Sequence, residues 1–300
     1  MSHRTSTRLL EAAVSGKVER PLLAPLVSAA AGELQGLGPR ALLQDVTKLT
    51  NGLRDLTLSL GADVATVEFG TFWDAEAIRV GLDWSPGQPI PRTHPMSVLP
   101  EADFATRRRA PGVLEAIRRL RVLLQDRALV AAGVTGPVTL THLIGARSPT
   151  QAVPALLSAV RLLCDAGAQL IWVVEGPEAP SDPDGLRAAM APVWGTIRFY
   201  QALGVLHLSG EADAWLPFVA LGGPNVPCFD PDRASAIASR ALSNETPVGL
   251  ALPPGVPSPT AKKLARTGRC LVLTHDHDLA GRVAARDLLQ TVGALGSLLS

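Results

Sequence analysis

The feature that most constrains the fold is a repeat of short apolar runs with helix-like segments between them. Eight runs have the length of strands: 21–27, 63–69, 128–134, 169–174, 205–208, 226–229, 248–252 and 270–273. Strands that are apolar at successive positions are typical of parallel sheets with both faces buried. The intervening segments place apolar residues at helical spacing, as Leu42 to Leu60 do before Gly61. Eight such units predict a single-domain (β/α)8 TIM barrel over residues 1–300.

An open doubly wound sheet is the alternative for alternating strands and helices. It offers no reason for the count to stop at eight. The sequence also lacks the glycine-rich fingerprint of dinucleotide-binding sheets and the phosphate loop of nucleotide hydrolases. The barrel is therefore the favoured architecture, closed by pairing of the run at Cys270 to Leu273 with the first run.

Composition excludes several classes of partner. The 300 residues carry 28 basic and 27 acidic side chains, so no basic surface for nucleic acid is indicated. The first twenty residues lack a signal-peptide apolar region, and no run approaches the roughly 20 residues that span a bilayer. Three widely spaced cysteines do not form a disulfide framework. We expect a soluble cytoplasmic protein without nucleic-acid or membrane partners.

Polar residues follow the apolar runs at the ends where a barrel places its active site. They are Glu68, Thr135, Glu175, His207, Asp230, His275 and His277, with His142 just beyond the third run. Grouped carboxylates and imidazoles can transfer protons or hold a divalent metal. We predict Glu68, His207 and His275 as catalytic residues whose side chains share one cavity. The predicted metal ligands are His207, Asp230, His275 and His277.

Each of these residues also has a structural interpretation that stays open. Glu68 and Glu175 can serve as helix caps or salt-bridge partners, and His207 can be a core residue. His142 precedes a helical segment, where packing is an alternative to substrate contact. Arg107 to Arg109 form a short basic cluster that is typical of a solvated helix start.

Residues 70–111 are rich in Gly, Pro and Trp and predict a long loop. Large rings on such a loop, Phe72, Trp73 and Trp84, need a ligand, a lid contact or a second subunit as partner. We expect at least one of them to border the pocket, and a homodimer stays open. The predicted substrate-binding residues are Phe72, Trp73, His142 and Glu175.

Four motifs in order along the chain resemble the uroporphyrinogen decarboxylase superfamily. Gly133 to Leu140 resembles its glycine, glycine-proline, threonine-leucine signature, and Asp165 to Ile171 resembles its alanine-glycine-alanine helix end. Val205 to Gly210 is similar to its histidine-x-cysteine-glycine turn. Leu273 to His277 lies where the decarboxylases have leucine-glycine-histidine-glycine and the related methyltransferases a metal-binding cysteine. The resemblance implies a (β/α)8 barrel.

The resemblance implies two chemistries, and the sequence departs from both. The decarboxylases grip substrate carboxylates with an N-terminal arginine-rich motif, which Gly16 to Arg20 lack. The methyltransferases use zinc to activate an acceptor thiol. Their ligand cysteine is Ser209 here, and the second cysteine is replaced by His275 to His277. A zinc site of histidines and carboxylates and a metal-free site are both consistent with the sequence.

Three functions follow as expectations. The first is a methyltransferase that moves a methyl group of a small-molecule substrate to or from a thiol, or a corrinoid carried by a partner protein. The second is a decarboxylase or other lyase acting on a small carboxylate or porphyrinogen-like substrate, with His275 as acid and Glu68 as charge partner. The third is a non-catalytic barrel subunit, which Ser209 favours.

Overall fold

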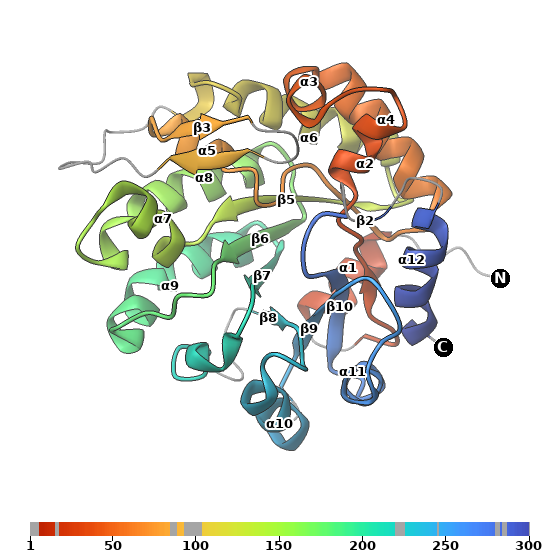
Figure 1. The fold of residues 1–300 in the computed structure, drawn as a ribbon, viewed down its shortest axis with the longest axis vertical. Coiled ribbons are helices and arrows are strands. Elements are labelled where there is room, and N and C mark those ends of the chain that lie inside the picture. Colours follow the sequence, from red (N-terminus) through yellow and green to blue (C-terminus); the bar gives the residue numbers. More distant parts are fainter. Residues whose placement is uncertain are drawn as a thin grey trace.

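Each of the eight apolar runs forms a strand, and the eight strands form one parallel, nearly closed barrel (Figure 1). The computed structural model describes residues 6–15, 18–84, 89–92, 104–219, 226–244, 246–279, 283 and 287–299. The barrel strands are β1 (Leu22–Leu23), β2 (Val64–Thr66), β5 (Leu129–Thr135), β6 (Leu170–Glu175), β7 (Leu203–Leu208), β8 (Val226–Phe229), β9 (Val248–Leu252) and β10 (Cys270–His275). The predicted single-domain TIM barrel is confirmed.

The barrel is closed by contacts of β1 with the strands on either side of it, β10 and β2. β1 pairs with β10 in parallel, with Leu22 opposite Val272, as predicted. On the other side, the backbone N–H of Asp63, just before β2, donates to the carbonyl oxygen of Leu23 at 2.9 Å. The Asp63 carboxylate accepts from the Leu23 N–H at 2.8 Å and from Arg20 at 2.6 and 2.7 Å. This ion pair holds the seam between β1 and β2, the two end strands in the order of the sheet.

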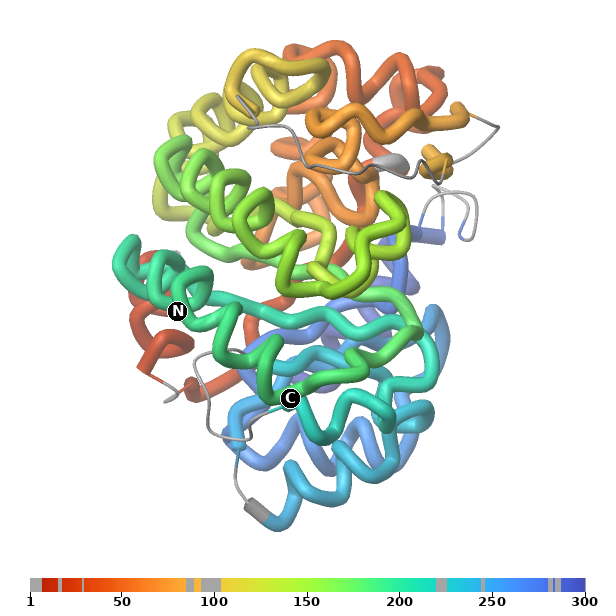
Figure 2. The backbone as a smooth tube through the Cα atoms, turned by 90° about the vertical axis from the view of Figure 1, so that its left-hand side faces the viewer, coloured from red at the N-terminus to blue at the C-terminus, as the bar shows by residue number. Residues whose placement is uncertain are grey.

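Helices surround the strands and follow one another around the molecule, as the colours in Figure 2 show from orange through green to blue. They are α2 (Ser28–Glu33), α3 (Pro39–Gln44), α4 (Val46–Ser59), α5 (Trp73–Ala77), α6 (Ala110–Leu124), α7 (Pro137–Ile144), α8 (Val153–Asp165), α9 (Pro183–Phe199), α10 (Ser235–Asn244), α11 (Pro259–Ala265) and α12 (Leu288–Gly296). In the described part of the chain, no helix is both long and apolar enough to cross a membrane.

Alternation along each strand divides the apolar side chains into an inner and an outer core. In β6, Leu170 and Trp172 belong to the barrel interior, whereas Ile171 and Val173 pack under the helices. The helix α1 (Ser6–Val14) contributes Leu10 and Ala13 to the inner core. Because it packs against the barrel interior, α1 covers the amino-terminal end, and the carboxyl end is left to form a site.

The predicted loop at 70–111 is more structured than expected. It contains α5, a hairpin of β3 (Gly81–Asp83) and β4 (Ile90–Arg92), and a short 3-10 turn at Phe104–Thr106. Residues 85–88 and 93–103 lie outside the described residues. The short length of these elements explains why hydrophobic periodicity did not predict them. Between β7 and β8 the structure shows a short 3-10 turn over Ala212–Trp215, and residues 220–225 lie outside the described residues.

Candidate active site

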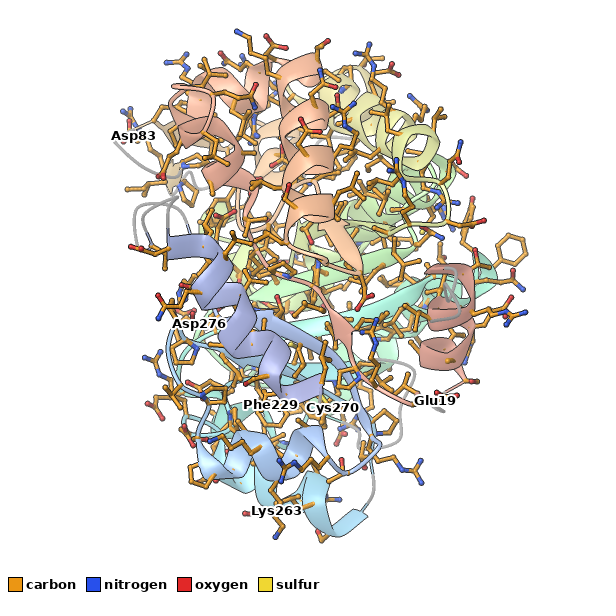
Figure 3. The ribbon with its side chains drawn as sticks, turned by 90° about the vertical axis from the view of Figure 1, so that its right-hand side faces the viewer. Glu19, Asp83, Phe229, Lys263, Cys270 and Asp276 are labelled. Atoms are coloured by element: carbon orange, nitrogen blue, oxygen red, sulfur yellow. The ribbon has the colours of Figure 1, made fainter. Side chains whose placement is uncertain are left out.

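A cavity of about 350 Å³ opens at the carboxyl ends of the strands. Its walls come from the β2–α5 connection, the β4 strand, the ends of β5, β6 and β7, and the segment after β10. They are Phe69, Gly70, Thr71, Phe72, Trp73, Asp74, Pro89, Ile90, Pro91, Gly133, Val134, Thr135, Thr139, Val174, Glu175, Gly176, Ser209, Asp276, His277 and Asp278. In Figure 3, Asp276 lies toward the same side of the molecule as Asp83 of the hairpin, away from Glu19, which precedes β1.

The start of α5 is hydrogen-bonded to the carboxyl-terminal half of β5. The Trp73 indole N–H donates to the carbonyl oxygen of Gly133 at 2.8 Å. The Asp74 carboxylate accepts from the backbone N–H of Thr135 at 2.7 Å and from its hydroxyl at 2.8 Å. Burial raises the pKa of Asp74, and these donors act in the opposite direction. Phe72 and Trp73 both line the cavity, which confirms that at least one loop ring borders it.

Glu175 both lines the cavity and caps a helix. Its carboxylate accepts from the backbone N–H groups of Val138 and Thr139 at 3.0 and 2.9 Å and from the Thr139 hydroxyl at 2.7 Å. These N–H groups belong to the first turn of α7, where a helix leaves its donors unpaired. Burial nevertheless raises the pKa of Glu175 to about 7. A side chain at Gly136 would overlap the Glu175 carboxyl group, so this turn requires glycine.

Three consecutive polar residues after β10 line the cavity: Asp276, His277 and Asp278. Nδ1 of His277 lies 3.0 Å from a carboxylate oxygen of Asp276, an ion-pair distance when the ring is protonated. Asp278 accepts a hydrogen bond from the Ser28 hydroxyl. The His277 side chain is 40% exposed, whereas Asp276 is 10% exposed. His277 therefore presents to the cavity an imidazole backed by a carboxylate, an arrangement that can transfer protons.

Glu68 does not line this cavity, and its ion-pair interpretation is confirmed. Both carboxylate oxygens accept from the guanidinium of Arg109, at 3.1 and 3.3 Å, and one also accepts from the Thr71 hydroxyl. Arg109 further donates to Glu76 at 2.8 Å and to the carbonyl oxygen of Thr71 at 2.8 Å. Burial raises the pKa of Glu68 to about 7, although Arg109 lowers it.

The expectation that Arg107 to Arg109 form a solvated helix start is wrong for Arg109. This side chain is 7% exposed, and its guanidinium faces the Trp84 ring at 5.1 Å. The arginine lies directly before α6, yet it pairs with Glu68 of the β2–α5 connection and with Glu76 of α5. Arg109 thus holds the segment from Glu68 to Thr71, part of which lines the cavity, without lining the cavity itself.

His207 lies inside the barrel below the cavity. Its ring contacts the edge of Phe69 at 4.8 Å between centroids, and Nε2 lies 3.4 Å from the carbonyl oxygen of His275. The side chain is fully buried, and burial lowers its pKa to about 4. His207 is therefore surrounded as a core residue is. The expectation that its side chain shares this cavity with those of Glu68 and His275 is wrong, because none of the three lines it.

His275 faces away from the barrel interior. It lies two residues after Leu273, which packs in the outer core, so the strand pleat directs both side chains toward the helices. Burial lowers the pKa of His275 to about 4. The next residue, Asp276, takes the opposite direction and lines the cavity. The predicted residue, His275, and the residue that lines the cavity, Asp276, are thus neighbours in the sequence whose side chains point in opposite directions.

The predicted metal ligands are dispersed. Among the described residues, no three His, Cys, Asp or Glu side chains are grouped so that they could hold a metal ion. Asp230 instead accepts from the Asp232 N–H at 3.0 Å and lies 3.6 Å from Arg233. Burial raises the pKa of the Cys164 and Cys270 thiols to about 12. The residues present do not fit the thiolate zinc site that the resemblance implies.

His142, a predicted substrate-binding residue, lies on the exposed side of α7, 4.0 Å from Glu178, and does not line the cavity. Sequence reasoning missed three carboxylates and a hydroxyl of the walls: Asp74, Asp276, Asp278 and Thr139. The signal for Asp276 and Asp278 was present in the alternation of His and Asp after the last strand. Asp74 lies in α5, a helix of 5 residues inside the predicted loop, which is too short for hydrophobic periodicity to indicate.

Comparison with known proteins bears on the fold. Neither a protein-family model nor a curated protein matches the sequence. Among solved structures, the chain is similar to a methyltransferase from Methanosarcina mazei, with a TM-score of 0.78, 18% identity and 99% of each chain covered. What they share is the barrel.

Other barrels match less well. A sugar phosphate isomerase/epimerase from Parabacteroides distasonis has a TM-score of 0.53 at 11% identity, covering 94% of this chain and 96% of that one. A 2,3-dimethylmalate lyase has a TM-score of 0.51 at 12% identity, covering 97% and 87%. At these identities, the likenesses show the architecture and leave the reaction to the site itself.

Proposed function

We propose that the chain is a methyltransferase that moves a methyl group between a small molecule held in the cavity and a carrier, a thiol or a corrinoid on a partner protein. Two observations support this. The fold is shared over its whole length with a methyltransferase. The cavity also carries the His277–Asp276 pair on its wall, and this is the observation that carries the proposal.

The His277–Asp276 pair can remove the proton of a thiol acceptor in a site that has no thiolate ligands for a metal. A thiol is a weak nucleophile until it loses its proton. His277 accepts the thiol proton, and Asp276 stabilises the resulting imidazolium at 3.0 Å. The sulfur then forms a bond to the methyl carbon. The bond between methyl and donor breaks, and its electron pair stays on the donor.

A small carboxylate as substrate is disfavoured by the charge of the walls. The described lining contains four carboxylates, Asp74, Glu175, Asp276 and Asp278, and neither lysine nor arginine. Capture of a carboxylate requires basic donors, of which the guanidinium is the best suited. The lyase alternative therefore lacks a binding group in this part of the chain.

The test is methyl transfer from ¹³C-methyl donors of three kinds, an onium salt, a thioether and an ether. Each is offered with 2-mercaptoethanol or free cob(I)alamin as acceptor and followed by NMR. We expect transfer from at least one donor. His277→Ala should slow transfer to the thiol about 100-fold or more, because general-base catalysis is lost. Transfer to cob(I)alamin, which has no proton to lose, should change little.

The matched control is His142→Ala, because His142 is exposed and lies off the cavity. It should leave both rates unchanged. Absence of transfer for all six pairs of donor and acceptor would contradict the proposal and favour a non-catalytic barrel. Equal loss for both acceptors in His277→Ala would show that His277 is not the base for the thiol.

A further inference from the structure

Three aromatic rings line the cavity, and two of them are held in place by contacts with the barrel strands. They are Phe69 and Phe72 from the β2–α5 connection and Trp73, the first residue of α5. Trp73 is fixed by its hydrogen bond to Gly133, and Phe69 is packed edge-on against Trp172 at 5.9 Å between centroids. Because these contacts fix Phe69 and Trp73 where they line the cavity, both rings can present apolar surface to a ligand without rearranging.

The polar side of the same cavity is acidic. Asp74 and Glu175 are 3% and 1% exposed as residues, and each accepts its hydrogen bonds from the protein scaffold. Asp276 and Asp278 complete this side. The described walls hold neither lysine nor arginine to neutralise them, and His277 is the one basic side chain among those walls.

Aromatic rings and carboxylates that line one small cavity are complementary to a compact cation with an apolar surface. Rings attract cations through their electron-rich faces, and methylated onium groups are bound in this way. A volume of about 350 Å³ lies near the lower end of the range for ligand pockets and matches a small molecule. A phosphate or polycarboxylate would be repelled by the carboxylates of the described walls, which hold neither lysine nor arginine to bind it.

We propose that the methyl donor bound in this cavity is a small quaternary ammonium or tertiary sulfonium cation. The proposal rests on the methyl transfer proposed above and names the substrate class. The methyl carbon leaves a positively charged nitrogen or sulfur, which keeps the electron pair of the broken bond and becomes a neutral amine or thioether. The leaving group thus needs no proton, and the proton from the acceptor thiol stays on His277 beside Asp276.

Binding can be tested without turnover by titrating the full chain calorimetrically with three probes of similar shape. Choline is the cation, 3,3-dimethyl-1-butanol is its neutral counterpart, and 3,3-dimethylbutanoate is the anion. We expect choline to bind at least about tenfold more tightly than the alcohol, since several cation–ring and carboxylate contacts each contribute. The anion should not bind measurably.

Two variants with matched controls locate the binding. Phe72→Ala and Asp276→Asn should each weaken choline binding about tenfold, and Asp276→Asn should leave alcohol binding unchanged. The controls are Phe199→Ala and Asp184→Asn on α9, whose side chains are exposed. Both controls should bind choline as the unmodified chain does.

The substrate class is overturned if the alcohol binds as tightly as choline, if the anion binds better, or if Phe72→Ala and Asp276→Asn leave choline affinity unchanged. The two proposals fail separately. Transfer from a thioether or ether without choline binding would retain the methyltransferase and reject the onium donor. Choline binding without transfer from any donor would retain a cation site and reject the methyltransferase.

Discussion

At the scale of single residues, the surroundings of a side chain separate positions that look equivalent in the sequence. His207, His275 and His277 all follow the ends of strands. Only His277 is both on the cavity wall and partly exposed; the other two are buried, and their pKa is lowered to about 4. The pleat of a strand assigns neighbours to opposite faces, so an error of one position changes a wall residue into a core residue.

The lowered pKa of His207 makes a prediction about acid stability. The folded chain keeps this ring neutral down to about pH 4, whereas the unfolded chain protonates it near its ordinary pKa of about 6.5. Acid therefore favours unfolding, and this contribution to stability is lost as pH falls below about 6.5. Between pH 7 and pH 5, the free energy of unfolding of the wild type should fall by about 2 kcal/mol relative to that of His207→Phe.

The measurement is urea denaturation of both proteins at the two pH values. Because His275 is present in both, its similar contribution cancels in the comparison. A constant difference between the two proteins would mean that His207 is accessible or already charged in the folded state.

At the scale of elements, the sequence predicted the strands well because each is a continuous apolar run bounded by turn residues. Cys270 to Leu273 and its partner strand were placed correctly, as was the closure between them. The β2–α5 connection was not predictable in the same way. Its order comes from contacts distant in sequence, such as Trp73 with Gly133 and Arg109 with Glu68, and no local pattern encodes them.

The seam between β1 and β2 provides the prediction at this scale. Asp63 joins the two strands through its backbone and through a carboxylate that accepts from Arg20 and from the Leu23 N–H. Asp63→Ala should lower the free energy of unfolding by about 3 kcal/mol, since it leaves partly buried donors without their acceptor. The measurement is chemical denaturation.

The control for the seam is Asp55→Ala on α4. Asp55 is exposed and forms an ion pair with its neighbour Arg54 at 2.7 Å, so its loss should cost within about 0.5 kcal/mol. A similar, small effect of both substitutions would show that the seam does not depend on the carboxylate.

At the scale of the whole molecule, α1 packs against the amino-terminal end of the barrel, and the β2–α5 connection covers part of the other end. The cavity accordingly lies at the carboxyl ends of the strands. The barrel and the end that carries the site follow from the order of strands and helices. The identity of the wall residues depends on side-chain direction and on the β2–α5 connection, which the order of elements does not specify.

The central claim is that chemistry takes place in this cavity and not at the histidines buried beneath or beside it. The most direct measurement compares methyl transfer to 2-mercaptoethanol by His277→Ala and His207→Phe at pH 7. We predict a loss of about 100-fold or more for His277→Ala and a rate within about threefold of wild type for His207→Phe. A large loss in His207→Phe with a near-normal rate in His277→Ala would contradict the account.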